Sequence, residues 1–139
     1  MEDLIKQSTE NKAIVDRLYE AFSKGDVPGV LSGMDSKIVW NEAEGNKYAN
    51  GNPYIGPDAV LNGVFGPILA DHEYFNLKDI ELHEMLNGKV LATLRYDAKT
   101  KTGKAYNAQV AHLWILKGGK ITGFQQFVDT KKLDEAMTS

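Results

Sequence analysis

Residues 104–129 read KAYNAQVAHLWILKGGKITGFQQFVD and predict a long β-hairpin. Aromatic, aliphatic and polar side chains alternate over residues 105–116, which is the period of a strand and not of a helix. Gly118–Gly119 supplies the positive φ angles of a two-residue turn, and residues 120–128 return with apolar side chains on both faces. A strand pair that is covered on both faces belongs in the middle of a sheet.

One alternating set of this hairpin is expected to line a small-molecule pocket on the inner face of a curved sheet. This predicted pocket face consists of Asn107, Gln109, Ala111, Leu113, Phe124, Gln126 and Val128. The other set is then expected on the outer face of the sheet. This predicted outer face contains Tyr106, His112 and Trp114, together with Phe127.

Composition narrows the class of protein. The chain has 139 residues, the size of one domain, and we expect a single domain over residues 1–139. Its net charge of -3 gives no electrostatic case for nucleic acid, and without cysteine it has no disulfide or thiolate metal site. No stretch has the roughly 20 apolar residues of a membrane span. We therefore expect a cytoplasmic protein with no nucleic-acid partner and no membrane segment.

The first half of the chain predicts three helices and one short strand. Apolar residues at helical spacing run from Leu4 to Phe22, and Asp26 can cap a second, shorter helix. Residues 37–40 alternate as a strand that ends at Asn41, and a polar loop follows. The third helix begins at Pro57, and Pro67 predicts a kink or break near residues 63–66, because proline removes a helical hydrogen bond.

The second half predicts strands. Residues 75–86 and 89–98 are joined by Asn87–Gly88, a strong two-residue hairpin signal, and the long hairpin follows. Asp129 or Thr130 can cap a final short helix over residues 131–137. Helices grouped before most of the strands indicate an α+β domain, with about three helices on one face of a curved, mainly antiparallel sheet. Such a cone leaves a hollow at its open end, which suits a ligand.

The chain resembles the SnoaL-like branch of the NTF2-like superfamily, the cone-shaped fold of ketosteroid isomerases and polyketide cyclases. The resemblance covers about residues 11–136. It rests on Lys24-Gly25-Asp26, Val39-Trp40-Asn41-Glu42, Tyr54-Ile55-Gly56-Pro57-Asp58-Ala59-Val60, Leu113-Trp114-Ile115-Leu116, Gly119-Lys120-Ile121 and Phe127-Val128-Asp129-Thr130. It implies the fold and a homodimer through the outer sheet face, so Tyr106, His112 and Trp114 form the predicted dimer surface. Because this fold hosts isomerases, cyclases, hydrolases and binding proteins, it does not imply one reaction.

The usual acids and bases of the superfamily are replaced in this chain. By the resemblance, the isomerase base falls at Asn41, the isomerase acid at Ala111 and the cyclase acid at Gln126. Asn does not exchange a proton near neutral pH, and Ala has no donor. Tyr19 lies one residue from the place of the isomerase tyrosine. The remaining catalytic candidates are Glu42, in the loop expected to rim the pocket, Gln126 and Asn41.

Ligand contacts are expected from the pocket face and its entrance. Besides the hairpin residues they are Tyr19, Trp40, Asn41 and Tyr54. The amides of this set can orient a neutral, oxygen-bearing ligand or can instead satisfy one another and buried water. His72, His83 and His112 share no ligand spacing with one another or with a carboxylate, so no metal site is predicted, and no cofactor motif is present.

Three functions stay open at the level of sequence. The first is a pocket protein for an apolar, oxygen-bearing ligand, with or without isomerase-like or cyclase-like activity. The second is a hydrolase or lyase that uses Glu42 or a water held by amides. The third is a dimeric interaction module without catalysis.

Overall fold

The computed structural model describes residues 2–138. The helical elements are α1 (Glu2–Ser23), α2 (Val27–Ser32), η1 (Lys47–Gly51), α3 (Pro57–Val60), η2 (Leu61–Phe65), α4 (Gly66–Asp71) and α5 (Thr130–Met137). The strands are β1 (Met34–Asn41), β2 (Tyr54–Ile55), β3 (His72–Glu84), β4 (Lys89–Thr100), β5 (Ala105–Lys117) and β6 (Lys120–Val128). None of the helices in this range has the length and apolar character needed to cross a bilayer.

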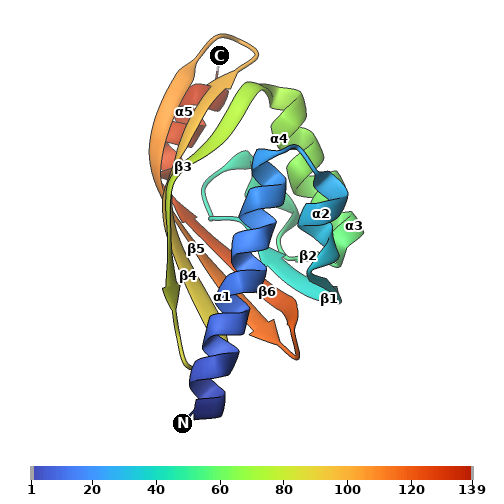
Figure 1. The fold of residues 1–139 in the computed structure, drawn as a ribbon. Helices are drawn as coiled ribbons and strands as arrows, with labels where there is room; N and C mark the ends of the chain where they lie inside the picture. The colour runs from blue at the N-terminus through green and yellow to red at the C-terminus, as the bar shows by residue number, and fades with distance from the viewer. Residues whose placement is uncertain (1, 139) are drawn as a thin grey trace.

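Within residues 2–138, six strands form one sheet in the order β2-β1-β6-β5-β4-β3. β1 and β6 are parallel, and the other neighbouring strands are antiparallel. Figure 1 shows the sheet bending around α1, with α2, α3 and α4 on the same side. A register shift in β3 between Lys78 and Glu81 adds to the bend, because bulges increase local twist. The predicted α+β fold with a curved, mainly antiparallel sheet is confirmed.

Aromatic side chains fill the centre of the core between the helices and the inner face of the sheet. The Trp40 ring stacks on Phe124 at a centroid distance of 3.7 Å, and its edge contacts Phe65 and Trp114. These four residues come from β1, β5, β6 and η2, so the cluster ties the sheet to the helical layer. Offset and edge-to-face pairs of this kind stabilise a core beyond the area they bury.

The third helix is interrupted as the sequence predicts. The α-helix that starts at Pro57 gives way to a π-helical turn over Leu61–Phe65, and α-helix resumes at Gly66. Pro67 lies in the first turn of the resumed helix, and it cannot donate a backbone hydrogen bond to the π-helical turn before it. The wide turn brings Val64 and Phe65 against the sheet, where both are buried.

A β-bulge next to the β5–β6 turn sets which side of β5 faces the helices. Leu116 pairs with Ile121, but the next pair is Ile115 with Gly123, so Thr122 is an extra residue on β6. A slip of one residue moves every following side chain to the other face of a strand. The bulge therefore changes which residues of β5 and β6 lie on the same face along the rest of the hairpin.

The pairs beyond the bulge show that the predicted inner face of β5 is wrong. Phe124 lies opposite Trp114, whereas a hairpin without the bulge would place it opposite Leu113, and Gln126 correspondingly lies opposite His112. Directly opposite residues share one face of a sheet. The inward residues of β5 are Tyr106, Ala108, Val110, His112, Trp114 and Leu116.

The predicted dimer surface is corrected for the same reason. Tyr106, His112 and Trp114 are 9%, 5% and 1% exposed in the single chain, so they belong to the interior. The exposed apolar side chains on the outer face of the hairpin are Ile115 and Phe127. Pairing of two copies through this outer face stays a prediction.

Two aspartates cap helices as predicted. Asp26 accepts a hydrogen bond from the backbone N–H of Gly29 at 3.0 Å at the start of α2, and Asp129 accepts one from Lys132 at 3.2 Å at the start of α5. A side chain that caps the first turn satisfies a backbone N–H that has no partner in the helix.

We expect Asp26→Ala to lower the free energy of unfolding by about 1 kcal/mol, because the cap at α2 is lost. Asp16 on α1 is the matched control, since it is exposed and makes no side-chain hydrogen bond within residues 2–138. Asp16→Ala should change stability by less than about 0.5 kcal/mol. Urea unfolding of both variants measures the difference, and equal costs would contradict the capping role.

Candidate functional site

A cavity of about 50 Å³ lies between α1, the η2–α4 segment and the inner face of the sheet. Its wall is mainly apolar. The lining residues that reach the surface are Phe22, Leu69, Phe75 and Leu77, so the cavity opens there. The lining residues that carry titratable or hydrogen-bonding groups are Tyr19, Trp40, Glu42, Tyr96, His112, Trp114 and Gln126.

Glu42 directs a carboxyl group into this cavity from the end of β1. Inward side chains alternate along the strand, so Trp40 and Glu42 both point inward. The Asn52 side chain holds the Glu42 backbone from the loop: it accepts from the Glu42 N–H at 2.9 Å and donates to the Glu42 carbonyl at 2.8 Å. The position of the carboxyl group is therefore fixed by a strand and by a loop.

Glu42 is 2% exposed, and within residues 2–138 only one of its two carboxyl oxygens has a hydrogen-bond partner. Trp40 Nε1 donates to Oε2 at 2.8 Å, and no hydrogen bond from residues 2–138 reaches Oε1. The Glu42 side chain is part of the cavity wall. Burial raises the pKa of Glu42 to about 7, although the hydrogen bond from Trp40 opposes the rise. Near neutral pH this group can therefore both take and release a proton.

The raised pKa of Glu42 predicts a pH-dependent stability. The folded chain holds the Glu42 proton more tightly than the unfolded chain, where the carboxyl pKa is near 4.5. The contribution of the Glu42 proton to folding stability is therefore complete below that pH and is lost as the pH rises through about 7. We expect Glu42 to lower the free energy of unfolding by about 3 kcal/mol across this interval. Urea unfolding at several pH values should show this loss in the wild type but not in Glu42→Gln, and parallel pH profiles would contradict it.

His112 lies on β5 with a tyrosine hydroxyl at each ring nitrogen. Nδ1 is 2.6 Å from the hydroxyl of Tyr19 on α1, and Nε2 is 2.7 Å from the hydroxyl of Tyr96 on β4. Burial lowers the pKa of His112 to about 3. Burial also raises the pKa of both tyrosines, and the charge of Glu42 adds to the rise at Tyr96. At neutral pH the imidazole is therefore uncharged and both hydroxyls keep their protons.

Trp114 and Gln126 donate to the far sides of these tyrosines. Trp114 Nε1 donates to the Tyr19 hydroxyl at 3.0 Å, and Gln126 Nε2 donates to the Tyr96 hydroxyl at 2.7 Å. Gln126 Oε1 accepts from the backbone N–H of Ala43 at 3.1 Å. The result is a continuous chain of hydrogen bonds from Trp114 to the residue that follows Glu42.

The cavity contains only part of the predicted ligand-binding set. Tyr19, Trp40, Phe124 and Gln126 line it. Because of the bulge, Asn107, Gln109, Ala111 and Leu113 lie on the outer face of the sheet, and Val128 lies beside a surface groove. The placement of the four β5 side chains in the pocket is wrong. Val128 lies opposite Val110 and packs against the core, so it is on the inner face as predicted, but it does not line the cavity. The binding role of the four residues that line the cavity stays a prediction.

Asn41 and Tyr54 also lie outside the cavity. Asn41 faces a polar surface groove because its neighbours Trp40 and Glu42 take the inward positions. The Tyr54 ring packs so closely on Gly63 that any side chain there would collide with it, and its hydroxyl donates to the Tyr48 carbonyl at 2.6 Å. Tyr54 therefore joins the loop to the helical layer.

The prediction from the sequence misplaced two polar residues of the cavity and did not single out a third. Glu42 was expected in a solvated loop at the mouth, but it is buried because the inward alternation of Ile38 and Trp40 continues for one more step. His112 was assigned to the outer face. Tyr96 was not singled out, although the alternation of β4 from Val90 onward places it inward.

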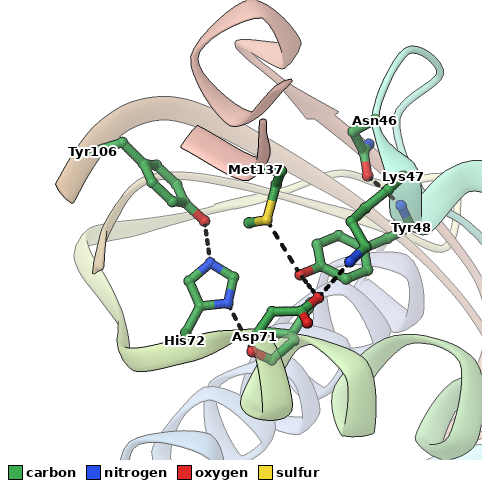
Figure 2. A network of polar contacts seen from close by, with 8 residues as sticks. Asn46, Lys47, Tyr48, Asp71, His72, Tyr106 and Met137 are labelled. Carbon is green, nitrogen blue, oxygen red and sulfur yellow. Dashed lines mark hydrogen bonds and ion pairs between the residues drawn. The ribbon is translucent and has the colours of Figure 1, made fainter. Parts of the chain in front are cut away.

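A second polar network lies beneath α5, away from the cavity. Figure 2 shows Tyr48 and Lys47 meeting Asp71, and His72 meeting Tyr106. The Tyr48 hydroxyl and Lys47 Nζ each donate to Asp71 Oδ2 at 2.8 Å. His72 Nδ1 is 2.7 Å from the Ile68 carbonyl, and Nε2 is 2.7 Å from the Tyr106 hydroxyl. This network joins α4, β5 and the loop after β1.

The curved sheet, the helical layer on one side and the apolar cavity define an NTF2-like protein. Within that class the chain belongs to the SnoaL-like domain family, whose sequence profile matches residues 15–124. The match spans most of the helical layer, the cavity and the sheet as far as Phe124.

Solved structures with this fold match nearly the whole chain. An NTF2-like protein of Burkholderia thailandensis is 28% identical with a TM-score of 0.86, and the match covers 93% of this chain and 98% of that one. TerC, co-crystallised with polyporic acid, is 23% identical with a TM-score of 0.82, and 94% and 99% are covered. A candidate polyketide cyclase of Xanthomonas campestris pv. campestris is 17% identical with a TM-score of 0.81, covering 95% and 99%.

Proposed function

We propose that the cavity binds a small apolar compound through a carbonyl oxygen, and that Glu42 removes a proton from the carbon beside that carbonyl. The observation that carries this proposal is Glu42 in the cavity wall, a buried residue whose carboxyl pKa is raised to about 7 and whose Oε1 accepts no hydrogen bond from residues 2–138. A base with a pKa near the working pH is ionised often enough to act and basic enough to hold the proton.

The wall of the cavity favours a ligand with few polar atoms. The space of about 50 Å³ suits the oxygen-bearing end of a ligand. The apolar remainder of the ligand would extend through the mouth at Phe22, Leu69 and Phe75. Ligand sites commonly combine such an apolar wall with a few polar groups that fix orientation. Here those groups are Glu42 and the tyrosines beside His112.

The proton transfer uses residues of this chain. Oε1 of Glu42 takes the proton, the electron pair of the broken C–H bond forms a C=C bond, and the carbonyl oxygen becomes an enolate oxygen. A hydroxyl of Tyr19 or Tyr96 donates a hydrogen bond to that oxygen and stabilises its charge. Return of the proton to the same carbon gives exchange, and return to another carbon gives isomerisation. Attack by the enolate carbon on a second carbonyl closes a ring, and the proton held by Glu42 then passes to the alkoxide oxygen that forms.

Two relatives support the kind of ligand. TerC has been co-crystallised with polyporic acid, and the Xanthomonas chain is a candidate polyketide cyclase. The reaction itself is inferred from Glu42 and the groups beside it, and not from these relatives.

Deuterium exchange into 1-indanone tests the proposal without knowledge of the natural substrate. This ketone carries exchangeable hydrogens at C2, and indane is the same ring system without the oxygen. We expect the protein to bind 1-indanone more tightly than indane and to speed the loss of the C2 proton signals in D₂O. Binding with exchange at the buffer rate would refute the proton transfer, and no preference over indane would refute the carbonyl ligand.

A further inference from the structure

His112 is placed so that the hydrogen-bond geometry does not choose its tautomer. Both of its ring nitrogens meet a hydroxyl group, at 2.6 Å for Tyr19 and 2.7 Å for Tyr96. A hydroxyl can donate or accept, and a neutral imidazole carries one N–H and one bare nitrogen. Either nitrogen can therefore hold the proton while both contacts are kept.

The groups on the far sides of the tyrosines fix the direction of the hydrogen bonds there. The indole N–H of Trp114 can only donate, so the Tyr19 oxygen accepts. Gln126 has its carbonyl oxygen taken by the Ala43 N–H, so its NH₂ group must donate to Tyr96. Both tyrosine oxygens already accept one hydrogen bond from outside, and neither hydroxyl proton can be directed toward these donors.

A count of protons then leaves one hydroxyl proton over. The two contacts of His112 need one hydrogen each, and the imidazole N–H supplies one of them. The hydroxyl of only one tyrosine supplies the other. If Nδ1 carries the proton, Tyr96 donates to Nε2 and the Tyr19 proton is left. If Nε2 carries it, Tyr19 donates to Nδ1 and the Tyr96 proton is left. Both tyrosines line the cavity.

We propose that the tautomer of His112 decides whether Tyr19 or Tyr96 offers its hydroxyl proton to an oxygen acceptor in the cavity. The network therefore presents one donor at either of two positions, and a ligand oxygen that sits nearer one tyrosine selects the tautomer that frees that donor. The carbonyl identity of the acceptor rests on the proposed function, whereas the coupling of tautomer to tyrosine does not.

His72 provides an internal reference with a fixed tautomer. Its Nδ1 lies 2.7 Å from the Ile68 carbonyl, which can only accept, so Nδ1 must carry the proton. Its Nε2 then accepts from the Tyr106 hydroxyl at 2.7 Å. Burial lowers the pKa of His72, so it too is neutral at neutral pH. His72 therefore has the Nδ1–H tautomer in every variant below.

The ¹⁵N NMR shifts of the imidazole nitrogens test the proposal in ligand-free protein. In Tyr19→Phe we expect His112 to move to the Nε2–H tautomer, because a buried N–H without an acceptor is avoided more strongly than a bare nitrogen. In Tyr96→Phe we expect the Nδ1–H tautomer, while His72 stays unchanged in both. The same tautomer of His112 in the two variants would overturn the proposal.

Binding of 1-indanone gives a second readout. Each single variant keeps one free hydroxyl proton and should lose less of the preference for 1-indanone over indane than the double variant. Tyr19→Phe combined with Tyr96→Phe should reduce that preference by about tenfold. If one single variant loses the whole preference and the other loses none, the donor is fixed and the proposal fails. If the two single variants have opposite His112 tautomers but the wild type does not prefer 1-indanone over indane, the coupling of tautomer to tyrosine is upheld. The carbonyl ligand of the proposed function is then refuted.

Discussion

Glu42→Gln should slow deuterium exchange at C2 of 1-indanone by about 10²-fold to 10⁴-fold, the range that a positioned base contributes. Gln keeps the shape of the side chain, and its carbonyl oxygen can still accept from Trp40 Nε1, but it cannot take a proton. Binding of 1-indanone should therefore survive. Proton NMR of the C2 signals at equal protein concentration measures the rate.

Glu44→Gln is the matched control for this variant. Glu44 lies two residues further along the same loop, is exposed and does not line the cavity, so the rate should stay within about twofold of the wild type. In the wild type the rate should rise with pH as Glu42 loses its proton and level off above its pKa of about 7. An unchanged rate in Glu42→Gln would assign the base to another group.

Trp114→Ala should lower the free energy of unfolding by about 3–5 kcal/mol, the cost of removing a large buried aromatic side chain. Trp114 is 1% exposed and contacts the rings of Tyr19, Trp40 and Phe124. Its loss opens a void at the centre of the core and removes the donor to the Tyr19 hydroxyl. Urea unfolding at fixed pH measures the change.

Phe127→Ala tests the opposite face of the same hairpin. Phe127 is 53% exposed, so its truncation should cost less than about 1 kcal/mol. A small cost for Trp114→Ala together with a large cost for Phe127→Ala would mean that the faces of β5 and β6 are the reverse of those described.

Local signals predicted most of the fold. The caps at Asp26 and Asp129 and the break before Pro67 each depend on a few adjacent residues, and each is found. Asn87 and Gly88 lie between β3 and β4 as predicted, but the pair nearest the turn is Glu84 with Val90, so the turn is longer than the predicted two residues. These features follow from backbone chemistry that does not depend on distant contacts. Their order along the chain was enough to indicate helices on one side of a curved sheet.

Alternation alone could not predict which side chains of β5 point toward the helices. Both alternating sets contain apolar residues, so hydrophobicity did not identify the inner one. The deciding feature is the extra residue Thr122 on β6, and the local signal for it is Gly123 inside a strand, since glycine there often marks a bulge. A side chain on Gly123 would press against Ile115.

The candidate site was predicted in part because its residues come from separate elements. Tyr19, Trp40, Phe124 and Gln126 were placed correctly, and Glu42 was recognised as a catalytic candidate but not as a buried one. The contact between His112 and the tyrosines joins α1, β4 and β5, and no spacing along the sequence encodes such a contact.

Asn52 holds the backbone at position 42 independently of the side chain there. Asn52 bonds only the main chain of Glu42, through the N–H and the carbonyl, and leaves the carboxyl group out of the contact. Any amino acid except proline could keep both of these bonds. Position 42 could therefore carry a different side chain, with different chemistry, while the surrounding loop keeps its course.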